Sequence, residues 1–178
     1  MIDANVVQGL DKTILIDIDI RHSLDADIEG IYQLYSQSSC YSETLQQPFA
    51  SLQVWQKRLL DLADNFYSLV AIRDGEVIGQ IGMEVFCNPR RKHVANIGMA
   101  VHEDFRGMGI ASALLEAMVS LAQNWLAIRR IELEVYTDNH LAISLYKKHG
   151  FVIEGEMREY AFRNGEYIDA FLMANVRD

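Results

Sequence analysis

The sequence predicts an α/β protein with a mixed central sheet, mostly antiparallel with one parallel pair of strands, flanked by helices. Helical and strand-like periodicities alternate along the 178 residues. The dipeptides Asp74-Gly75 and Asn164-Gly165 each separate two strand-like runs, which is typical of two-residue hairpin turns. A strand over 94–101, a helix and a strand over 130–137 form a crossover, and right-handed crossovers connect parallel strands.

The N-terminal part is predicted to contain one strand followed by two helices. Residues 14–21, "ILIDIDIR", alternate apolar and polar side chains and indicate a half-buried strand. Apolar residues at helical spacing predict a helix over 23–37, with Ser23 or Asp25 as its N-cap. A second helix over 48–64 is expected to begin at its proline.

Three strands are expected next, joined by short turns. Residues 66–86 form two strands separated by Asp74-Gly75. A turn over 88–93 leads into a further strand over 94–102. Consecutive strands joined in this way pair antiparallel.

The C-terminal half returns to alternating helices and strands. The predicted elements are a helix over 109–126, a strand over 130–137, a helix over 139–150, and strands over 151–162 and 167–176. Asp138 or Asn139 is expected to cap the second of these helices, and Gly150 to end it. The hairpin turn at Asn164-Gly165 joins the last two strands.

Length and composition predict a single domain over residues 1–178, with a core over about 14–176. Half the residues are hydrophobic, but no apolar run is long enough to span a membrane, and the N-terminus lacks the pattern of a signal peptide. Cys40 and Cys87, the only cysteines, fit reduced residues of a cytoplasmic protein. Without CxxC or HExxH motifs, no metal site is expected.

The formal net charge of -9 argues against nucleic-acid binding, since phosphate backbones would be repelled. It is compatible with a cationic substrate such as an amine.

The segment "DFRGMGIASALLEAM" (104–118) places two glycines at the start of a strong helix pattern. Such a turn exposes backbone N–H groups at the positive end of the helix dipole, which favours phosphate binding. A P-loop is excluded because Ile110 and Ala111, rather than Lys and Ser or Thr, follow Gly109. A dinucleotide fingerprint Gly107-x-Gly109-x-x-Ser112 would need a preceding strand that starts a βαβ unit, but the strand before this turn follows antiparallel hairpins. An ordinary tight strand-to-helix turn is the remaining structural alternative.

The pattern Arg106-x-x-Gly109-x-Ala111 resembles the acyl-CoA-binding motif Gln/Arg-x-x-Gly-x-Gly/Ala of the GNAT N-acetyltransferase superfamily. A second block, "ELEVYTDNHLAISLYKKHGFVIEG" (132–155), resembles the strand, Asn, Ala, Tyr and Gly-Phe signature of the same family. The predicted element order also matches that fold over about residues 14–176.

The resemblance implies that acetyl-CoA is the cosubstrate and that an amine attacks its thioester directly. It implies main-chain contacts to the pyrophosphate from Arg106, Gly107, Met108, Gly109, Ile110 and Ala111. It implies that the pantetheine arm pairs with Met99, Ala100 and Val101, where the strands over 94–101 and 130–137 splay apart. Asn139, Ala142 and Tyr146 complete the implied cofactor-binding set. A main-chain N–H on the 94–101 strand is expected to stabilise the oxyanion.

Tyr146 stands where the family often has the acid that protonates the leaving thiolate. A phenol has a pKa of about 10 and a thiol of about 8.5, so the hydroxyl stays protonated and can donate. The alternative role is core packing with Ile143 and Phe151. Asn139 has a similar choice between helix cap and cofactor contact, and both are compatible.

The base that deprotonates the amine has two candidates in the sequence. Glu84 interrupts the apolar run "IGMEVF", and His93 stands near the start of the next strand. Simple strand alternation would instead place Glu84 on a solvent face. A base acting through water, or an amine that needs none, stays open.

Within the superfamily, the stretches "PRRKHVA", "YKKHGF" and "YAFRNGEYIDAFLMA" resemble bacterial YhhY-like L-amino acid N-acetyltransferases. A free L-amino acid is therefore the expected substrate, and a homodimer the expected assembly. The basic cluster 89–92 is either solvated, a carboxylate contact or a dimer contact. The alternatives are acetylation of a protein N-terminus, a polyamine or an aminoglycoside, or a module that binds acetyl-CoA without turnover.

Overall fold

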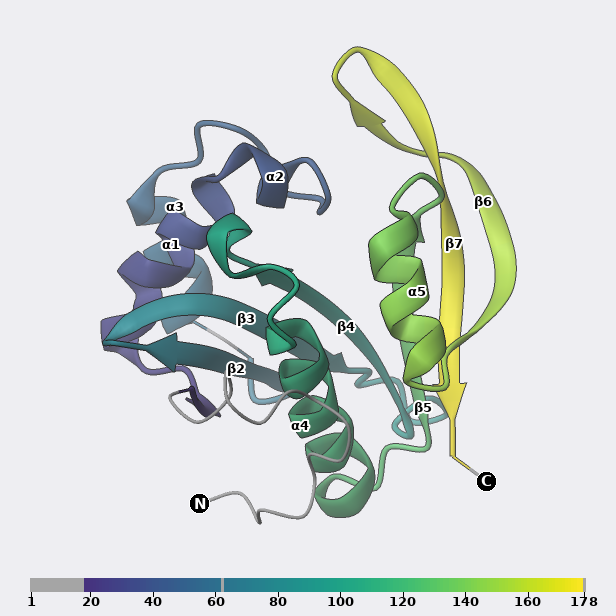
Figure 1. Ribbon diagram of the computed structural model, residues 1–178. Coiled ribbons are helices and arrows are strands. Elements are labelled where there is room, and N and C mark those ends of the chain that lie inside the picture. The colour runs from purple at the N-terminus through teal and green to yellow at the C-terminus, as the bar shows by residue number, and fades with distance from the viewer. Residues whose placement is uncertain (1–17, 62, 178) are drawn as a thin grey trace.

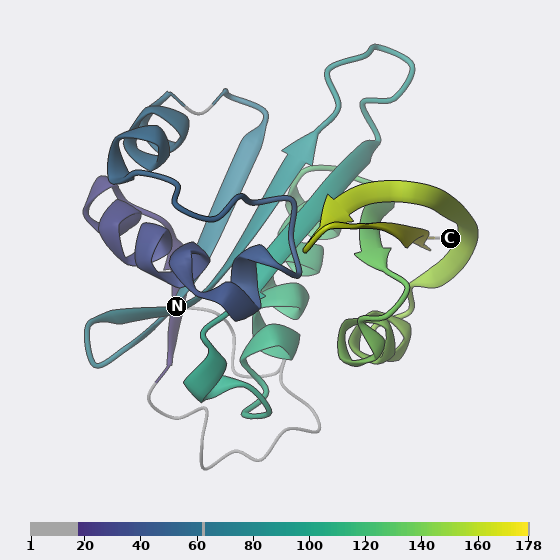
Figure 2. The same ribbon diagram turned by 90° about the horizontal axis from the view of Figure 1, so that it is seen from above.

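A computed structural model describes residues 18–61 and 63–177, which build one seven-stranded sheet with helices on both faces (Figures 1 and 2). The strand order is β1-β2-β3-β4-β5-β7-β6. The strands are β1 (Asp19–His22), β2 (Phe66–Arg73), β3 (Glu76–Val85), β4 (Val94–Val101), β5 (Arg130–Tyr136), β6 (Val152–Arg163) and β7 (Glu166–Val176). The helices are η2 (Asp25–Asp27), α1 (Ile28–Ser36), α2 (Ser38–Tyr41), α3 (Leu52–Leu60), η3 (Glu103–Phe105), α4 (Ile110–Trp125) and α5 (His140–Lys148). The predicted mixed sheet with one parallel pair is confirmed.

The prediction of one continuous helix over 23–37 was wrong. Residues 25–41 form η2, α1 and α2, and the first turn is capped neither by Ser23 nor by Asp25. The Asp27 carboxylate instead accepts from the Leu24 N–H at 2.7 Å and pairs with Arg21 at 2.6 Å. These contacts close a tight 3-10 turn before α1 begins. Of the predicted strand over 14–21, residues 14–17 lie outside the described part, and β1 follows.

The second predicted helix begins later than its proline suggests. Phe49 has a φ of 63°, a left-handed conformation that an α-helix does not contain. Ser51 then caps α3 by accepting from the Val54 N–H at 3.4 Å. The later elements agree with their predicted ranges to within a few residues.

The parallel pair is short, and its shortness creates the most important feature of the sheet. β4 and β5 pair at three positions, from Val94↔Arg130 to Asn96↔Glu132. Beyond them β4 continues to pair with β3, and β5 with β7, so the two strands diverge (Figure 1). The predicted splay is therefore present, and it opens toward the C-terminal ends of both strands.

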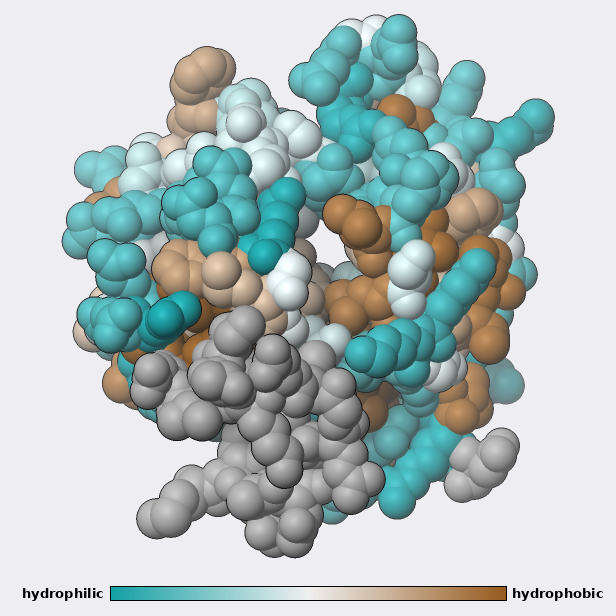
Figure 3. All heavy atoms as spheres, viewed as in Figure 1, coloured by the Kyte–Doolittle hydropathy of each residue, from teal (hydrophilic) through white to brown (hydrophobic). Residues whose placement is uncertain are grey.

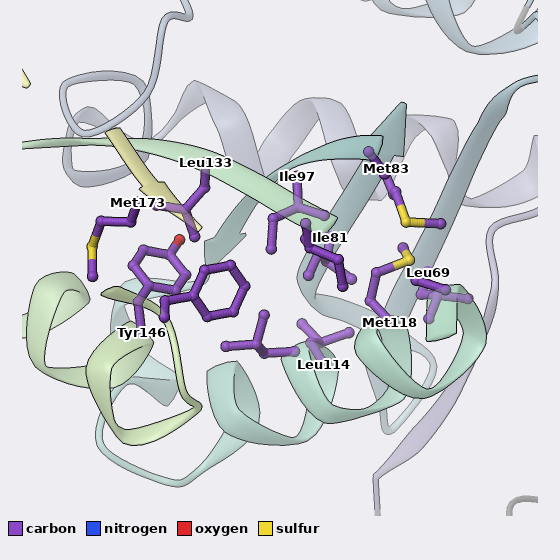
Figure 4. Close-up of a cluster of buried hydrophobic side chains, with 14 of the residues drawn as sticks. Leu69, Ile81, Met83, Ile97, Leu114, Met118, Leu133, Tyr146 and Met173 are labelled. Carbon is purple, nitrogen blue, oxygen red and sulfur yellow. The ribbon is translucent and has the colours of Figure 1, made fainter. Parts of the chain in front are cut away.

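Two cores hold the helices against the sheet. Leu69 of β2, Ile97 of β4 and Leu133 of β5 point toward α4 and α5, where Leu114 and Met118 meet them (Figure 4). On the other face, a second cluster covers the sheet beneath α1 to α3; its buried members include Ile31, Leu34, Tyr35, Trp55 and Val70. The alternation of Leu69 and Val70 between the two clusters is that of a strand buried on both faces.

Among residues 18–61 and 63–177, no helix is both long and apolar enough to cross a membrane.

Candidate active site

An opening passes through the molecule where β4 and β5 diverge. Figure 3, drawn in the same view as Figure 1, shows it between the end of β4 with η3 on one side and α5 on the other. Hydrophobic residues border it on the side of α5, and hydrophilic ones lie above it. The opening gives a ligand access to the splayed strands from both faces of the sheet.

The glycine turn lies at one rim of this opening. Gly107 and Gly109 have φ values of 76° and 84°, which glycine adopts without strain. Gly109 is the N-cap of the 16-residue helix α4, and no side chain caps its first N–H groups. A Cβ built on Gly107 would meet nothing within 4 Å. Uncapped N–H groups beside open space at the positive end of a long helix fit the pyrophosphate of acetyl-CoA.

The apolar side chains of this turn pack into the protein, and the exposed Arg106 is held by hydrogen bonds. Ile110 is buried and Met108 partly buried, both in the main core. The Arg106 guanidinium donates to the carbonyls of Val101 at 3.3 Å and Ser39 at 2.9 Å, and its N–H donates to Glu103. Arg106 therefore joins the turn to α2. Direct cofactor contacts of residues 106–111 stay a prediction, in which the free N–H groups after Arg106 are the best donors.

The outer half of β4 presents a strand edge to the opening. Met99, Ala100 and Val101 pair with β3, and the parallel pairing with β5 has already ended at Asn96. Apart from the Val101 carbonyl, which accepts from Arg106, the backbone groups on the β5 side are thus available to the amides of a pantetheine arm. Gly98, directly before them, is exposed, and a Cβ there would meet nothing within 4 Å.

Tyr146 has its ring in the core and its hydroxyl directed toward β5. The residue is 7% exposed, its ring centroid lies 5.7 Å from that of Phe151, and burial raises the pKa of the phenol to about 12. Figure 4 shows the hydroxyl directed from α5 toward Leu133 of β5. Among the described residues the Tyr146 hydroxyl has no hydrogen-bond partner. It is not fully enclosed either, because Glu116 Oε2 is the only fully enclosed side-chain oxygen or nitrogen there without a partner. The Tyr146 oxygen can therefore receive a ligand atom; its core packing is confirmed, and a catalytic role stays a prediction.

Asn139 is the N-cap of α5, because its Oδ1 accepts from the Ala142 N–H at 3.1 Å. The cap role is confirmed, and contacts of Asn139 and Ala142 with the cofactor stay predictions. Asp138, the alternative cap, instead pairs with Arg163.

The two predicted bases lie at different distances from the opening. Glu84 is exposed on β3 opposite Asn96 of β4, so the two side chains share one face of the sheet. His93 directly precedes β4 at the closed end, where its carbonyl accepts from the N–H groups of Arg129 and Arg130. The strands are still paired there, so His93 lies on the wrong side of the splay for a base.

A carboxylate that the sequence analysis missed lies closer to the opening. Glu134 of β5 is exposed and accepts from Asn96 Nδ2 at 3.2 and 3.0 Å, just past the last parallel pair. It belongs to the α1 face, whereas Leu133 and the Tyr146 hydroxyl belong to the α5 face. A phenol and a carboxylate therefore approach the gap from opposite faces. The alternation of polar and apolar residues in "ELEV" (132–135) could have indicated a carboxylate here, but it does not distinguish Glu134 from Glu132.

Glu132, the other glutamate of that run, is committed to structure. It is buried and binds Arg91 Nη2 with both oxygens at 2.8 Å and Arg130 Nε at 2.6 Å. The Arg91 guanidinium also lies 4.5 Å from the ring centroid of Phe86. Arg91 of the basic cluster 89–92 is thus ion-paired, although its side chain is still 49% exposed, and Arg90 and Lys92 are exposed as well.

Comparison with known proteins agrees with this geometry. The Acetyltransferase (GNAT) family matches residues 28–151. The L-amino acid N-acetyltransferase AaaT of Escherichia coli (strain K12) is 46% identical over 161 residues, covering 90% of this chain and 99% of that protein.

Solved structures show the same fold. An acetyltransferase of the GNAT family from Streptococcus pneumoniae has a TM-score of 0.80 at 26% identity, covering 90% of this chain and 99% of that one. A phosphinothricin acetyltransferase from Sinorhizobium meliloti, solved with acetyl-CoA, has a TM-score of 0.81 at 23% identity, covering 91% and 89%. With its glycine turn, splayed strands and family match, the chain belongs to the GNAT family and is an acetyl-CoA-dependent N-acetyltransferase.

Proposed function

We propose that this protein transfers the acetyl group of acetyl-CoA to the α-amino group of a free L-amino acid. The substrate class rests on the similarity to AaaT, which extends over nearly the whole of both chains. The observation that carries the reaction is the Tyr146 hydroxyl, which lies without a partner among the described residues beside the diverging strands. Initial rates of free-thiol release with single L-amino acids, polyamines, aminoglycosides and short peptides test the proposal. Turnover of peptides or polyamines but not of free amino acids would contradict the proposed substrate class.

The proposed roles follow from where each group lies. The free N–H groups of the glycine turn hold the diphosphate, and the edge of Met99 to Val101 aligns the pantetheine arm. The thioester then lies between β4 and β5, where a β4 N–H stabilises negative charge on its oxygen. Tyr146 donates to the leaving sulfur. Because a thiolate with a pKa of about 8.5 is a weaker base than this phenolate, Tyr146 acts first as a hydrogen-bond donor to the thiolate.

The raised pKa of Tyr146 predicts the shape of the pH profile. With a pKa of about 12, the phenol stays protonated throughout the working range, so kcat/KM rises as the amine loses its proton and then levels off. Rates measured between about pH 6 and 10 are expected to show no descending limb. A descending limb that disappears in Tyr146→Phe would contradict this, because the hydroxyl would then ionise within that range.

On the amine side we propose that Glu134, positioned by Asn96, accepts the proton of the attacking amine, with Glu84 as the alternative. Glu134→Gln is expected to lower kcat/KM about tenfold at neutral pH, with a smaller loss at high pH where the amine is already neutral. Glu84→Gln is the matched variant, one strand farther from the gap, and its loss is expected to be smaller. A larger, pH-dependent loss in Glu84→Gln would assign the role to Glu84 instead.

A further inference from the structure

Arg163 places a positive charge next to the amine side of the gap. It is the last residue of β6, its guanidinium lies 5.2 Å from the ring centroid of Tyr136, and its side chain is only 17% exposed. Tyr136 follows Glu134 by two residues on β5, so the two side chains share a face about 7 Å apart along the strand. A cation and a carboxylate therefore lie at neighbouring positions on one face.

The Arg163 guanidinium has donors to spare. Nη1 donates to the Ser42 carbonyl at 3.4 Å and to Glu43 Oε1 at 3.5 Å, and Nη2 donates to Asp138. These bonds use three of the five N–H donors of a guanidinium, and Nε makes none within residues 18–61 and 63–177. The Glu43 contact is long and belongs to a side chain that is 38% exposed. Another carboxylate could replace Glu43 at little cost.

Arg163 also lies where two remote segments meet over the α1 face. The Tyr136 hydroxyl donates to the Thr44 carbonyl at 3.1 Å, beside the contacts of Arg163 with Ser42 and Glu43. Figure 2 shows the β6–β7 hairpin curving back toward the connection between α2 and α3. The hairpin and the connection together bound the amine side of the gap, with Arg163 at their junction.

Arg91, which pairs with another carboxylate of this face, is less suited to bind a ligand. Arg91 holds both oxygens of Glu132 at 2.8 Å, and that carboxylate is only 12% exposed. Removing Arg91 from Glu132 would weaken the pairing of a buried charge, which is costly. Arg163 has exposed carboxylate partners instead, with Asp138 at 55%.

We propose that Arg163 binds the α-carboxylate of the amino-acid substrate in place of Glu43, while Glu134 faces its α-amino group. This role rests on the proposed function. A free amino acid carries its two charged groups on one carbon, and the site places the Arg163 guanidinium and the Glu134 carboxylate at neighbouring positions. Guanidinium and carboxylate are both planar and can pair through two parallel hydrogen bonds, which makes Arg163 a specificity-determining residue.

The test compares a free amino acid with its methyl ester, which keeps the amine and removes the negative charge. The amino acid is the one that the wild-type protein acetylates fastest. Arg163→Gln is expected to lower kcat/KM for the acid about tenfold to a hundredfold and to change the ester less than about threefold. Arg163→Lys should recover part of the loss for the acid. Arg91→Gln is the comparison variant, and its acid-to-ester ratio should equal that of the wild type.

Glu43→Gln gives a second test that does not depend on the stability of the Arg163 variants. If Glu43 occupies the place of the substrate carboxylate, its neutral replacement lowers KM for the acid and leaves the ester unchanged. Equal losses for acid and ester in Arg163→Gln, or a higher KM for the acid in Glu43→Gln, would overturn the proposal while leaving amino-acid acetylation intact. Wild-type turnover of other amines but of no free amino acid would overturn the proposed function and this role together.

Discussion

Replacing Gly109 by valine is expected to raise the Kd of acetyl-CoA about a hundredfold or more. Gly109 is the N-cap of α4 with a φ of 84°, and its lack of a side chain lets a phosphate approach the uncapped N–H groups. Charge-assisted hydrogen bonds contribute about 1.5–3 kcal/mol each, so losing one or two gives an effect of this size. Isothermal titration of acetyl-CoA into wild type and variant measures it.

Gly75→Val is the matched control for the backbone strain of that substitution. Gly75 has a φ of 83° in the β2–β3 hairpin, and a Cβ there would meet nothing within 4 Å. Both variants should lose about 1–2 kcal/mol of unfolding free energy through their left-handed conformation. Only Gly109→Val should lose acetyl-CoA affinity. Unchanged affinity in a folded Gly109→Val would show that the diphosphate binds elsewhere.

Tyr146→Phe is expected to lower kcat about a hundredfold while changing KM for acetyl-CoA by less than about threefold. The hydroxyl acts on the leaving sulfur as charge develops there, whereas the ring, packed against Phe151, stays in place. The Tyr146 hydroxyl has no partner within the described residues, so the variant should also keep the wild-type melting temperature. Steady-state kinetics and thermal unfolding measure both quantities.

Tyr35→Phe is the control for removing a phenol from the interior. The Tyr35 hydroxyl donates to Gln80 Oε1 at 2.7 Å, so its loss should cost about 1 kcal/mol of unfolding free energy. The kinetic effect should be far smaller than that of Tyr146→Phe. Wild-type turnover in Tyr146→Phe would remove Tyr146 as the donor and leave it a core residue.

The sheet was predictable from the sequence because local signals specified it. Asp74-Gly75 and Asn164-Gly165 both adopt the positive φ values that two-residue hairpin turns require. The first helices were less predictable, because tertiary contacts set their ends. The ion pair between Asp27 and Arg21 joins the first helical turn to β1, and nothing in the local pattern around residue 27 announces it.

The residues of the candidate site likewise differ in whether local sequence or long-range contacts determine their positions. The glycine turn and Tyr146 stand in contiguous motifs, so their places at the start of α4 and on α5 follow from local sequence. Glu134 meets Asn96 across 38 positions, and that pairing depends on the register of two parallel strands. Arg163 meets Ser42 across 121 positions, which depends on how the last hairpin curves over the sheet. Hydrophobic periodicity along the sequence specifies neither of these long-range contacts.

A one-pot competition tests the central claim most directly. Wild-type protein is given acetyl-CoA and an equimolar mixture of the common L-amino acids, spermidine, an aminoglycoside and a short peptide, and the acetylated products are identified by mass spectrometry. The products are expected to be Nα-acetyl amino acids, formed in step with free thiol. Because product ratios in a mixture report relative kcat/KM, the main product identifies the preferred substrate class. Acetylated spermidine, aminoglycoside or peptide as the main product would contradict free amino acids as the substrate.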